Sequence, residues 1–249
     1  MSEVVVRRAT DRDIAIKSMT AQIKSLAGAS TADLIGITPG SAFTAEELGE
    51  LGSSFGEVRS VIVLAQHIID PMQETRFRSS LDRESALVAT SFADAMLRDA
   101  CWRVVMVLRD AGYRAAIPRN MRYGPDELRH QISYKKAAVL AGFGAVGRSS
   151  LLINPEWGPW IRLRTVITDA PLPPGEKISF SPCDGCRSCL DACPSGALAD
   201  DGFNRTACEA FCRDVVCVSP LGHINCDSCM RACPVGTVPP QLSLEGIGK

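Results

Sequence analysis

The sequence lacks a surplus of basic residues. Its 249 residues carry 27 Lys and Arg against 28 Asp and Glu, which gives a formal net charge of −1. A protein that binds a long polyanion usually shows a basic excess. This balance gives no support for broad nucleic-acid binding, although it leaves room for a local basic patch.

The sequence also lacks the long apolar runs of membrane proteins. No run reaches the roughly 18 apolar residues expected of a membrane-spanning helix. The first residues, MSEVVVRRATDRD, contain paired arginines but no apolar stretch of signal-peptide length behind them. They therefore match neither a secretory nor a twin-arginine signal. We expect a cytoplasmic protein that does not bind a membrane.

Cysteine, by contrast, is abundant and concentrated. Ten of the eleven cysteines lie between Cys183 and Cys233. In a reducing compartment such a density favours metal or redox chemistry over disulfides. The remaining cysteine, Cys101, falls in a helical apolar stripe and is expected to be an ordinary core residue.

The strongest motif is a run of four cysteines followed by proline. Its spacing, C-x2-C-x2-C-x3-C-P, is that of bacterial ferredoxins, in which three thiolates bind one [4Fe–4S] cluster and the fourth binds the other. Thiolates three residues apart can wrap three corners of a cube, whereas the next starts a helix that points toward the neighbouring cluster. The run consists of Cys183, Cys186, Cys189, Cys193 and Pro194.

A second, shorter run repeats the last part of the first. It consists of Cys226, Cys229, Cys233 and Pro234, and His223 stands where the pattern would place another cysteine. Zinc is the alternative metal for such cysteine pairs, but a zinc site needs four ligands in tetrahedral geometry. The repeated run that ends in Cys-Pro is more typical of an iron–sulfur site. The spacing leaves three candidates for the missing ligand: Cys208, Cys212 and Cys217.

Upstream of the cysteines, strand and helix patterns alternate, which predicts an α/β or α+β sandwich to about residue 170. Thr44 and Glu47 form a capping-box pattern that predicts the start of a short helix. A proline-rich stretch, 171–182, predicts a linker. Apolar spacing predicts helices over 11–27, 81–111 and 132–142, and strands over 32–39, 58–66, 113–118 and 161–169.

The segment AAVLAGFGAVGRSSLLINPEWGPWIRLRTVITDAPL (137–172), followed by the double cysteine run, resembles the cobalamin-dependent reductases. That family includes epoxyqueuosine reductase, the reductive dehalogenases and short proteins with a 4Fe–4S double-cluster binding domain. The resemblance covers roughly residues 55–236. It implies an α+β protein: a nitroreductase-like α/β sandwich that binds base-off cobalamin, here 1–172, followed by a bacterial-type ferredoxin domain with two [4Fe–4S] clusters, here 173–249.

The resemblance also implies which residues bind the cofactors. One cluster would use Cys183, Cys186, Cys189 and Cys233, and the other Cys193, Cys226, Cys229 and Cys208. Glycines without a Cβ would permit close approach to the flat macrocycle. The run GFGAVG also imitates a dinucleotide fingerprint, but it follows helix-like sequence, which argues against NAD. The expected cobalamin contacts are Gly142, Gly144, Gly147, Arg148, Ser149, Leu151, Asn154, Trp157, Gly158 and Arg164.

The proton donor is the least determined part of the site. At the position of the aspartate that epoxyqueuosine reductases use, this sequence has Leu128, with Asp126 and Glu127 nearby. Reductive dehalogenases use a tyrosine assisted by a basic residue, and a nearby cation would lower the pKa of a phenol. The catalytic candidates are Tyr123, Tyr134 and Lys135, with His67 and His130 in reserve.

We therefore expect a cobalamin- and [4Fe–4S]-dependent oxidoreductase acting on a small organic or nucleoside substrate. Electrons would come from an external donor such as ferredoxin or flavodoxin. One alternative is a non-catalytic electron carrier or reductive activator of a partner, and another is epoxyqueuosine reductase in tRNA modification. With the net charge of −1 and only 16 residues after Cys233, a tRNA substrate is not favoured.

Overall fold

A computed structural model gives the fold of residues 2–28, 32–68, 82–118, 120–122, 128–130, 132–214 and 226–236. The chain forms two compact units, each assembled from separate stretches. Unit 1 comprises residues 1–66, 94–143 and 163–178, and unit 2 comprises 67–93, 144–162 and 179–249. The sequence predicts a single domain boundary near residue 172, and that boundary stays a prediction.

Unit 1 is built on a four-stranded sheet. The central strand β2 (Ser60–His67) is buried on both faces over its first six residues, which explains why it reads as a continuous apolar run rather than an alternating one. The strand over 161–169 is confirmed, and only two residues of the predicted strand over 113–118 pair. The order is β1-β2-β8-β3, with β1 at Leu34–Pro39, β3 at Ala115–Ala116 and β8 at Ile161–Thr168.

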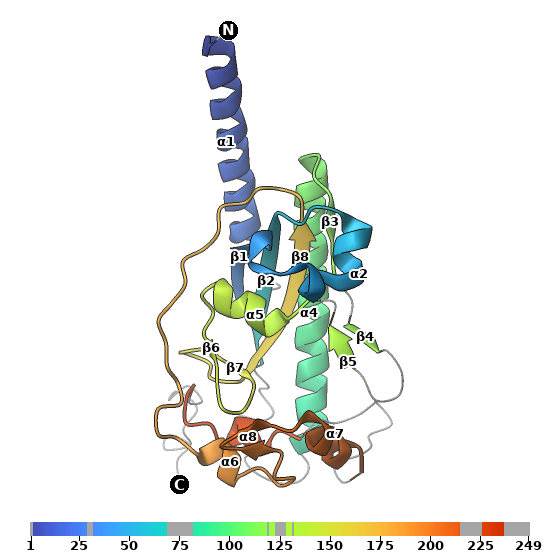
Figure 1. Cartoon of the computed structure of the whole chain (residues 1–249), viewed down its shortest axis with the longest axis vertical. Coiled ribbons are helices and arrows are strands. Elements are labelled where there is room, and N and C mark those ends of the chain that lie inside the picture. The colour runs from blue at the N-terminus through green and yellow to red at the C-terminus, as the bar shows by residue number, and fades with distance from the viewer. Residues whose placement is uncertain are drawn as a thin grey trace, which may run out of the picture. The chain divides into compact units, whose positions relative to one another are not determined.

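Helices cover both faces of this sheet (Figure 1). On one face, Ile23 of α1 (Ser2–Ser25) and Leu97 of α4 (Asp82–Asp110) pack with Ile37 and Ile62 of the strands. On the other face, a Cβ on Gly36 would lie 2.7 Å from the Phe143 ring, just after α5 (Tyr134–Leu140). The sheet is therefore the middle layer of a sandwich.

The predicted helix boundaries are confirmed where capping chemistry sets them. Thr44 accepts a hydrogen bond from the Glu47 N–H at 3.2 Å and donates its own N–H to the Glu47 carboxylate at 2.8 Å. This capping box begins α2 (Ala45–Phe55). Gly112, at φ 83°, ends α4, where the Tyr113 N–H returns to the Leu108 carbonyl. The sequence did not predict η1 (Gly40–Ala42) or the hairpin of β4 (Asn120–Arg122) and β5 (Leu128–His130).

An ion pair ties α5 to the capped end of α2. The Lys136 ammonium donates to both Glu47 carboxylate oxygens, at 2.6 and 2.7 Å, and it lies 5.2 Å from the centre of the Phe43 ring. Glu47 accepts hydrogen bonds from the Lys136 side chain and the Thr44 backbone, and these hold the pKa of Glu47 below its ordinary 4.5. Lys136 is therefore a structural cation in unit 1.

We expect Glu47→Gln to lower stability in a pH-dependent way. Because the folded-state pKa of Glu47 is depressed, its ionic contribution is fully present above pH 4.5 and is lost as pH falls through the depressed value. Urea unfolding of both proteins at pH 7 and at successively lower pH measures this. The difference in unfolding free energy should shrink on acidification. A difference that grew toward low pH would contradict the ion pair.

The described part of unit 2 is formed mainly of short elements and turns. One apolar cluster among its described residues consists of Cys189, Leu190 and Leu198, with Cys193 and Cys229 packed against it. The elements are β6 (Ala145–Val146), β7 (Leu152–Ile153), α6 (Ser188–Asp191), β9 (Leu198–Ala199), β10 (Gly202–Phe203), α7 (Arg205–Asp214) and α8 (Ser228–Arg231).

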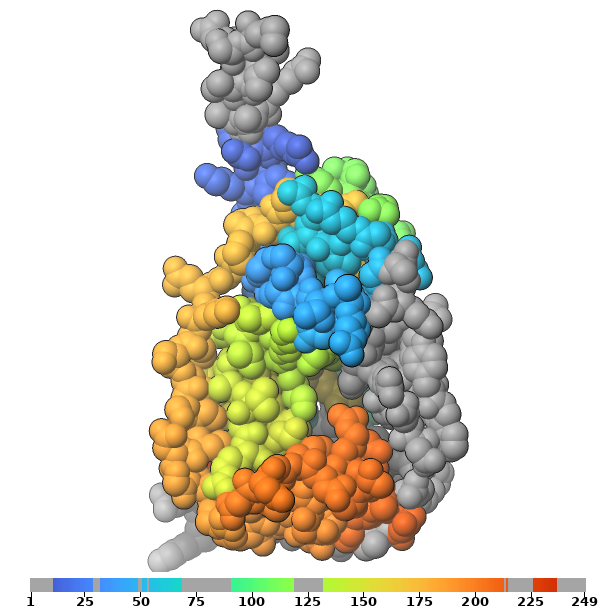
Figure 2. Space-filling model, viewed as in Figure 1, coloured from blue at the N-terminus to red at the C-terminus, as the bar shows by residue number. Residues whose placement is uncertain are grey.

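The linker predicted over 171–182 has no regular structure, and its unit 1 part lies close to α5. The Gly175 N–H donates to the Ile37 carbonyl at 2.9 Å, and a Cβ on Gly142 would lie 2.2 Å from the Glu176 carbonyl oxygen. In Figure 2, the unit 1 part of this linker (amber) lies beside the residues that begin α5 and follow it (yellow-green). Across the described residues, none of the helices combines the length and apolarity needed to cross a bilayer.

Candidate metal centre

The partial repeat of the cysteine motif is also a structural repeat. Two four-residue helices, α6 and α8, begin at Ser188 and Ser228 and lie against each other (Figure 1). In each, the residue before the helix accepts a hydrogen bond in the first turn, from Leu190 to Arg187 and from Met230 to Asp227. Equivalent spacing has therefore produced equivalent backbone turns, each of which ends in Cys-Pro.

Four thiols gather at the α6 turn, and we call them the first thiol set: Cys183, Cys186, Cys189 and Cys233. Burial raises the pKa of the Cys189 thiol, and the other three thiols raise it further because they lie close by. Burial also raises the pKa of Cys233, again with Cys183 and Cys186 as neighbours. Residues far apart in the chain therefore converge, and Cys233 joins from the second run.

Five more thiols form the second thiol set: Cys193, Cys208, Cys212, Cys226 and Cys229. Burial raises the pKa of Cys229 to about 11, with contributions from Cys226, Cys189 and Cys193. Burial likewise raises the pKa of Cys208 to about 12, and the nearby thiols of Cys212, Cys229 and Cys226 add to the effect. The second set thus holds one thiol more than a four-cornered cluster needs.

Hydroxyls accompany three of the thiols. The Ser188 hydroxyl lies 3.5 Å from the Cys186 sulfur, and the Ser228 hydroxyl lies 3.3 Å from Cys226. Hydrogen bonding to Ser188 lowers the pKa of Cys186. Burial opposes ionisation of Cys193, yet hydrogen bonds from Ser195 and the backbone lower its pKa overall. Since the thiolate is the form that ligates metal, these contacts favour ligation.

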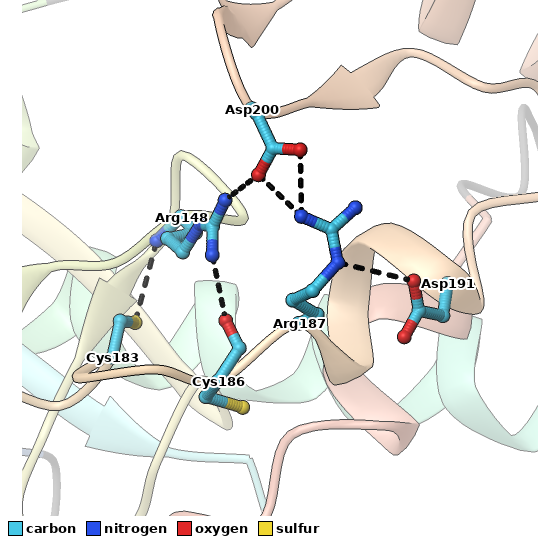
Figure 3. A network of polar contacts seen from close by, with 6 residues as sticks. All are labelled: Arg148, Cys183, Cys186, Arg187, Asp191 and Asp200. Carbon is cyan, nitrogen blue, oxygen red and sulfur yellow. Dashed lines mark hydrogen bonds and ion pairs between the residues drawn. The ribbon is translucent and has the colours of Figure 1, made fainter.

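Arg148 connects the β6–β7 turn to the first thiol set (Figure 3). Its backbone N–H donates to the Cys183 sulfur at 3.4 Å, and its guanidinium donates to the Cys186 carbonyl at 3.0 Å and to Asp200. Arg187 also donates to Asp200, at 2.6 Å. The pKa of Asp200 is lowered by Arg187 first and by Arg148 second. Two cations and one carboxylate thus brace the loop that carries Cys183 and Cys186.

The glycines predicted to contact cobalamin lie close to the protein's own chain. A Cβ on Gly144 would lie 2.0 Å from the Ile153 carbonyl oxygen, and one on Gly147 would lie 2.8 Å from an Ile153 side-chain carbon. On Gly142 it would meet Glu176. The close approach that these glycines permit is to the protein's own chain. Their role as cobalamin contacts stays a prediction without that support.

Other predicted cofactor residues have internal partners. The Asn154 side chain accepts hydrogen bonds from the backbone N–H groups of Glu156 and Trp157, at 2.9 and 3.0 Å. The Trp157 indole stacks on His67 with ring centres 5.1 Å apart. Arg164 is 8% exposed and donates to Asp94 at 2.6 Å. Of the remaining candidates, Ser149 and Gly158 are buried and Leu151 is half-buried.

The catalytic candidates remain untested. The Tyr134 hydroxyl is buried and donates to the Pro118 carbonyl at 3.1 Å, so a proton held there already has an acceptor. Lys135 follows on α5 and is half-buried. Tyr123 lies outside the described residues, as do Asp126 and Glu127. His130 ends β5, and nothing is described of its side chain.

Within the described ranges, no three Cys, His, Asp or Glu side chains converge as the ligands of one metal ion would. A single zinc ion draws its ligands to about 2.3 Å from one point. A cubane presents four separate irons, so its thiolates stand further apart than the ligands of a single ion.

Comparison with known proteins gives relatives that match less than half of the chain. It is 33% identical over 113 residues to an epoxyqueuosine reductase of Bacillus cereus, a match that covers 42% of this chain and 30% of that protein. It is 34% identical over 120 residues to a tetrachloroethene reductive dehalogenase of Desulfitobacterium hafniense, covering 47% of this chain and 20% of the relative. The matches thus span less than a third of these relatives. No protein-family model matches the chain.

Solved structures extend the likeness to most of the fold. A reductive dehalogenase described as B12-dependent superposes with a TM-score of 0.61 at 19% identity, covering 90% of this chain and 32% of the other. An epoxyqueuosine reductase solved with an epoxyqueuosine-modified tRNA stem loop gives 0.54 at 19% identity, covering 90% of this chain and 66% of the other. The mixed helix-and-sheet fold predicted from the sequence is confirmed at this level.

The same findings overturn one expectation. The net charge and the short tail predict that a tRNA substrate is not favoured, and this prediction is wrong: a structural relative has been solved with an epoxyqueuosine-modified tRNA stem loop, and curated relatives are named epoxyqueuosine reductase. The net charge of −1 averages over the whole chain, whereas phosphate contacts depend on local cations. The family expected from residues 137–172 and the cysteine spacing is confirmed. Curated relatives and solved structures that are epoxyqueuosine reductases or reductive dehalogenases support that resemblance.

Proposed function

We propose that this chain is a reductase that holds two [4Fe–4S] clusters and works with a corrinoid on a small organic or nucleoside substrate. The observation that carries the proposal is the convergence of two thiol sets from two runs of sequence, with Cys233 crossing from one run to the other. In two-cluster ferredoxins, likewise, the last cysteine of a run binds the cluster that the other run holds. The named activities of the relatives support the reductive chemistry.

The donor sets fit iron–sulfur clusters. The first thiol set supplies four cysteines, and the second supplies Cys193, Cys226, Cys229 and one further thiol from α7. Hydrogen bonds lower the pKa of Cys186 and Cys193 and so favour the thiolates that a cluster requires. Bound clusters of this type supply one-electron transfer at low potential.

The chain itself provides the insulated path between the two sets. Cys189 of the first set is 8% exposed and packs with Leu190 and Leu198, against which Cys193 and Cys229 of the second set also lie. The Cys229 thiol has both Cys189 and Cys193 among its neighbours. An apolar contact of this kind excludes water and keeps the two sets adjacent. With clusters bound, the two sets would meet across this apolar contact, which would suit electron transfer between them.

Fewer residues are left to bind a corrinoid than to bind the clusters. Arg148, Asn154, Trp157 and Arg164 have partners within the protein, and a Cβ on Gly142, Gly144 or Gly147 would meet atoms of the protein's own chain. Ser149, Leu151 and the backbone of the β6–β7 hairpin remain. The corrinoid therefore rests on the family likeness, and its chemistry when bound would be strongly reducing. The residues Tyr123, Tyr134 and Lys135 stay our candidates for the proton donor.

Anaerobic reconstitution with iron and sulfide, followed by titration with cobalamin, tests the proposal. We expect about eight irons per chain for two [4Fe–4S] clusters, and a base-off Co(II) EPR signal at about one per chain. Binding of zinc in place of iron would overturn the cluster assignment. Full iron content without corrinoid binding would favour the second candidate, a non-catalytic electron carrier or activator. The electron-carrier function is considered because most residues predicted to contact the corrin already have partners within the protein.

Epoxyqueuosine is the substrate to test first, because the curated relatives include epoxyqueuosine reductases. The assay combines the reconstituted, cobalamin-loaded protein with a reductant and epoxyqueuosine-containing tRNA, and then analyses the nucleosides. Conversion to queuosine would assign the substrate. Unchanged epoxyqueuosine would direct the search to small organic substrates, with ferredoxin or flavodoxin as the electron donor in either case.

We expect Arg148→Gln to lower the reduction potential of the cluster in the first thiol set. The change removes a cation that lies against Cys186, and a nearby positive charge favours the added electron. An EPR-monitored redox titration measures it. Arg103→Gln is the control, because Arg103 is an exposed α4 cation paired only with Asp99 among the contacts described. Equal potentials in wild type and Arg148→Gln would show that the network only braces the loop.

A further inference from the structure

We propose that one corner of the cluster in the second thiol set is shared by two thiols, Cys208 and Cys212, either of which can bind the iron. The inference rests on the proposed function, since it presumes that this set holds a cluster. It goes further by assigning a ligand role to Cys212, which the family resemblance does not give. The geometry of α7 carries it.

Cys208 and Cys212 stand one turn apart on the same face of α7. Residues i and i+4 of a helix are neighbours on its surface, separated by about 5–6 Å between Cβ atoms. Both side chains are half-buried. The Cys208 thiol is hydrogen-bonded to that of Cys212 and lies near Cys226 and Cys229. Two thiols of one helix therefore lie beside the second cysteine run: Cys208 near Cys226 and Cys229, and Cys212 against the Cys226 backbone.

The hydrogen bonds do not single out Cys208. The backbone N–H of Cys226 donates to the Cys212 sulfur at 3.4 Å. The first thiol set contains the same arrangement, in which the Arg148 N–H donates to the Cys183 sulfur, also at 3.4 Å. Hydrogen bonds to ligand sulfurs stabilise the thiolate and tune a cluster's potential. Cys212 thus has the bond typical of a ligand, whereas Cys208 has the thiol neighbours.

Exchange between the two thiols needs no electron and no outside reagent. The iron–sulfur bond to Cys208 breaks as its sulfur takes a proton, and the Cys212 thiol gives up a proton as its sulfur binds the iron. The helix need not unfold, because the thiols differ by a single turn. The form ligated through Cys212 keeps the N–H···S bond from Cys226 on a ligand sulfur, so it is the form with the higher reduction potential.

The test is iron content and EPR of reconstituted Cys208→Ala, Cys212→Ala and the double variant. Alanine leaves no oxygen to replace the sulfur, and it is the most favourable helix residue. We expect each single variant to keep about eight irons, with distinct reduction potentials, and the double variant to lose about half. Cys193→Ala is the control for loss of an unshared ligand, and circular dichroism of the apoproteins reports on folding.

Loss of half of the iron in only one of the single variants would overturn the proposal and identify that residue as the sole ligand. Full iron in the double variant would also overturn the proposal, because the fourth ligand would then be another residue. Cys217, which lies outside the described residues, would be tested next. Failure of wild type itself to bind two clusters would be a failure of the proposed function, and that result is read before any variant.

Discussion

Gly236→Ala is expected to remove about half of the iron from the reconstituted protein, whereas Gly196→Ala should leave it in place. Both glycines follow a Cys-Pro pair by two residues, and both have positive φ, 74° and 63°. Alanine in this left-handed region costs about 1–2 kcal/mol at either site. The two changes share that backbone penalty, so it cannot explain a difference between them.

The difference lies in what a Cβ would meet. At Gly236 it would lie 2.0 Å from the Gly158 nitrogen and 2.1 Å from the Trp157 carbonyl carbon, which are backbone atoms that cannot rotate away. At Gly196 nothing lies within 4 Å. The clash would push the 233–236 turn away from the 154–158 turn. Cys233 sits on that turn, so the first thiol set would lose its fourth member.

Iron counting and EPR of the two variants, reconstituted in parallel, measure this. Gly158→Ala serves as a reciprocal change, because its Cβ would lie 1.9 Å from the Val235 carbonyl oxygen, and it should lose the same cluster. Equal iron in Gly236→Ala and Gly196→Ala would mean that the two turns can separate without moving Cys233. Such a result would contradict the close crossing seen here.

The sequence predicted those features that local chemistry determines. The capping box at Thr44 needs two residues three apart, and the apolar run of β2 needs only burial on both faces, so both could be found without a structure. The partial repeat of the cysteine run could also be found without a structure, and it corresponds to equivalent turns at α6 and α8. Helix α4 was predicted within a residue of its bounds because Gly112 ends it.

What the sequence could not give were the partners that fold into place from far along the chain. Gly147 reads as a residue that frees space for a cofactor, yet Ile153 fills that space. Arg148 reads as a cofactor contact, yet it braces a cysteine loop through Asp200, 52 residues away. Nothing in a local pattern distinguishes a glycine needed by the backbone from one needed by a ligand. The same holds for a cation with a distant carboxylate.

Arg164 also has a partner far along the chain, Asp94. The change Asp94→Ala is expected to lower the free energy of unfolding by about 3–5 kcal/mol. The Arg164 guanidinium donates to both carboxylate oxygens of Asp94, at 3.2 and 2.6 Å, and joins β8 to α4. Arg164 is only 8% exposed. Removing Asp94 would leave a charge buried without its partner, which costs more than an ion pair contributes.

Asp99→Ala is the matched control on the same helix. Asp99 pairs with Arg103 one turn along, at 2.7 Å, but both side chains are about half exposed. Exposed pairs at this spacing contribute roughly 0.3–0.5 kcal/mol, so urea unfolding should separate the two variants clearly. A similar small loss in both would mean that solvent reaches Arg164 well enough to replace Asp94.

A double replacement then decides whether Arg164 has a second role. Exchanging a buried ion pair for apolar residues of similar size is often close to neutral in stability, so Asp94→Leu with Arg164→Met should recover most of the loss. If Arg164 serves only to join β8 to α4, this stable variant should bind cobalamin as wild type does. If cobalamin binding falls while stability is restored, the guanidinium contacts the corrinoid as well, and the contact predicted from the sequence would stand beside the ion pair seen in the structure.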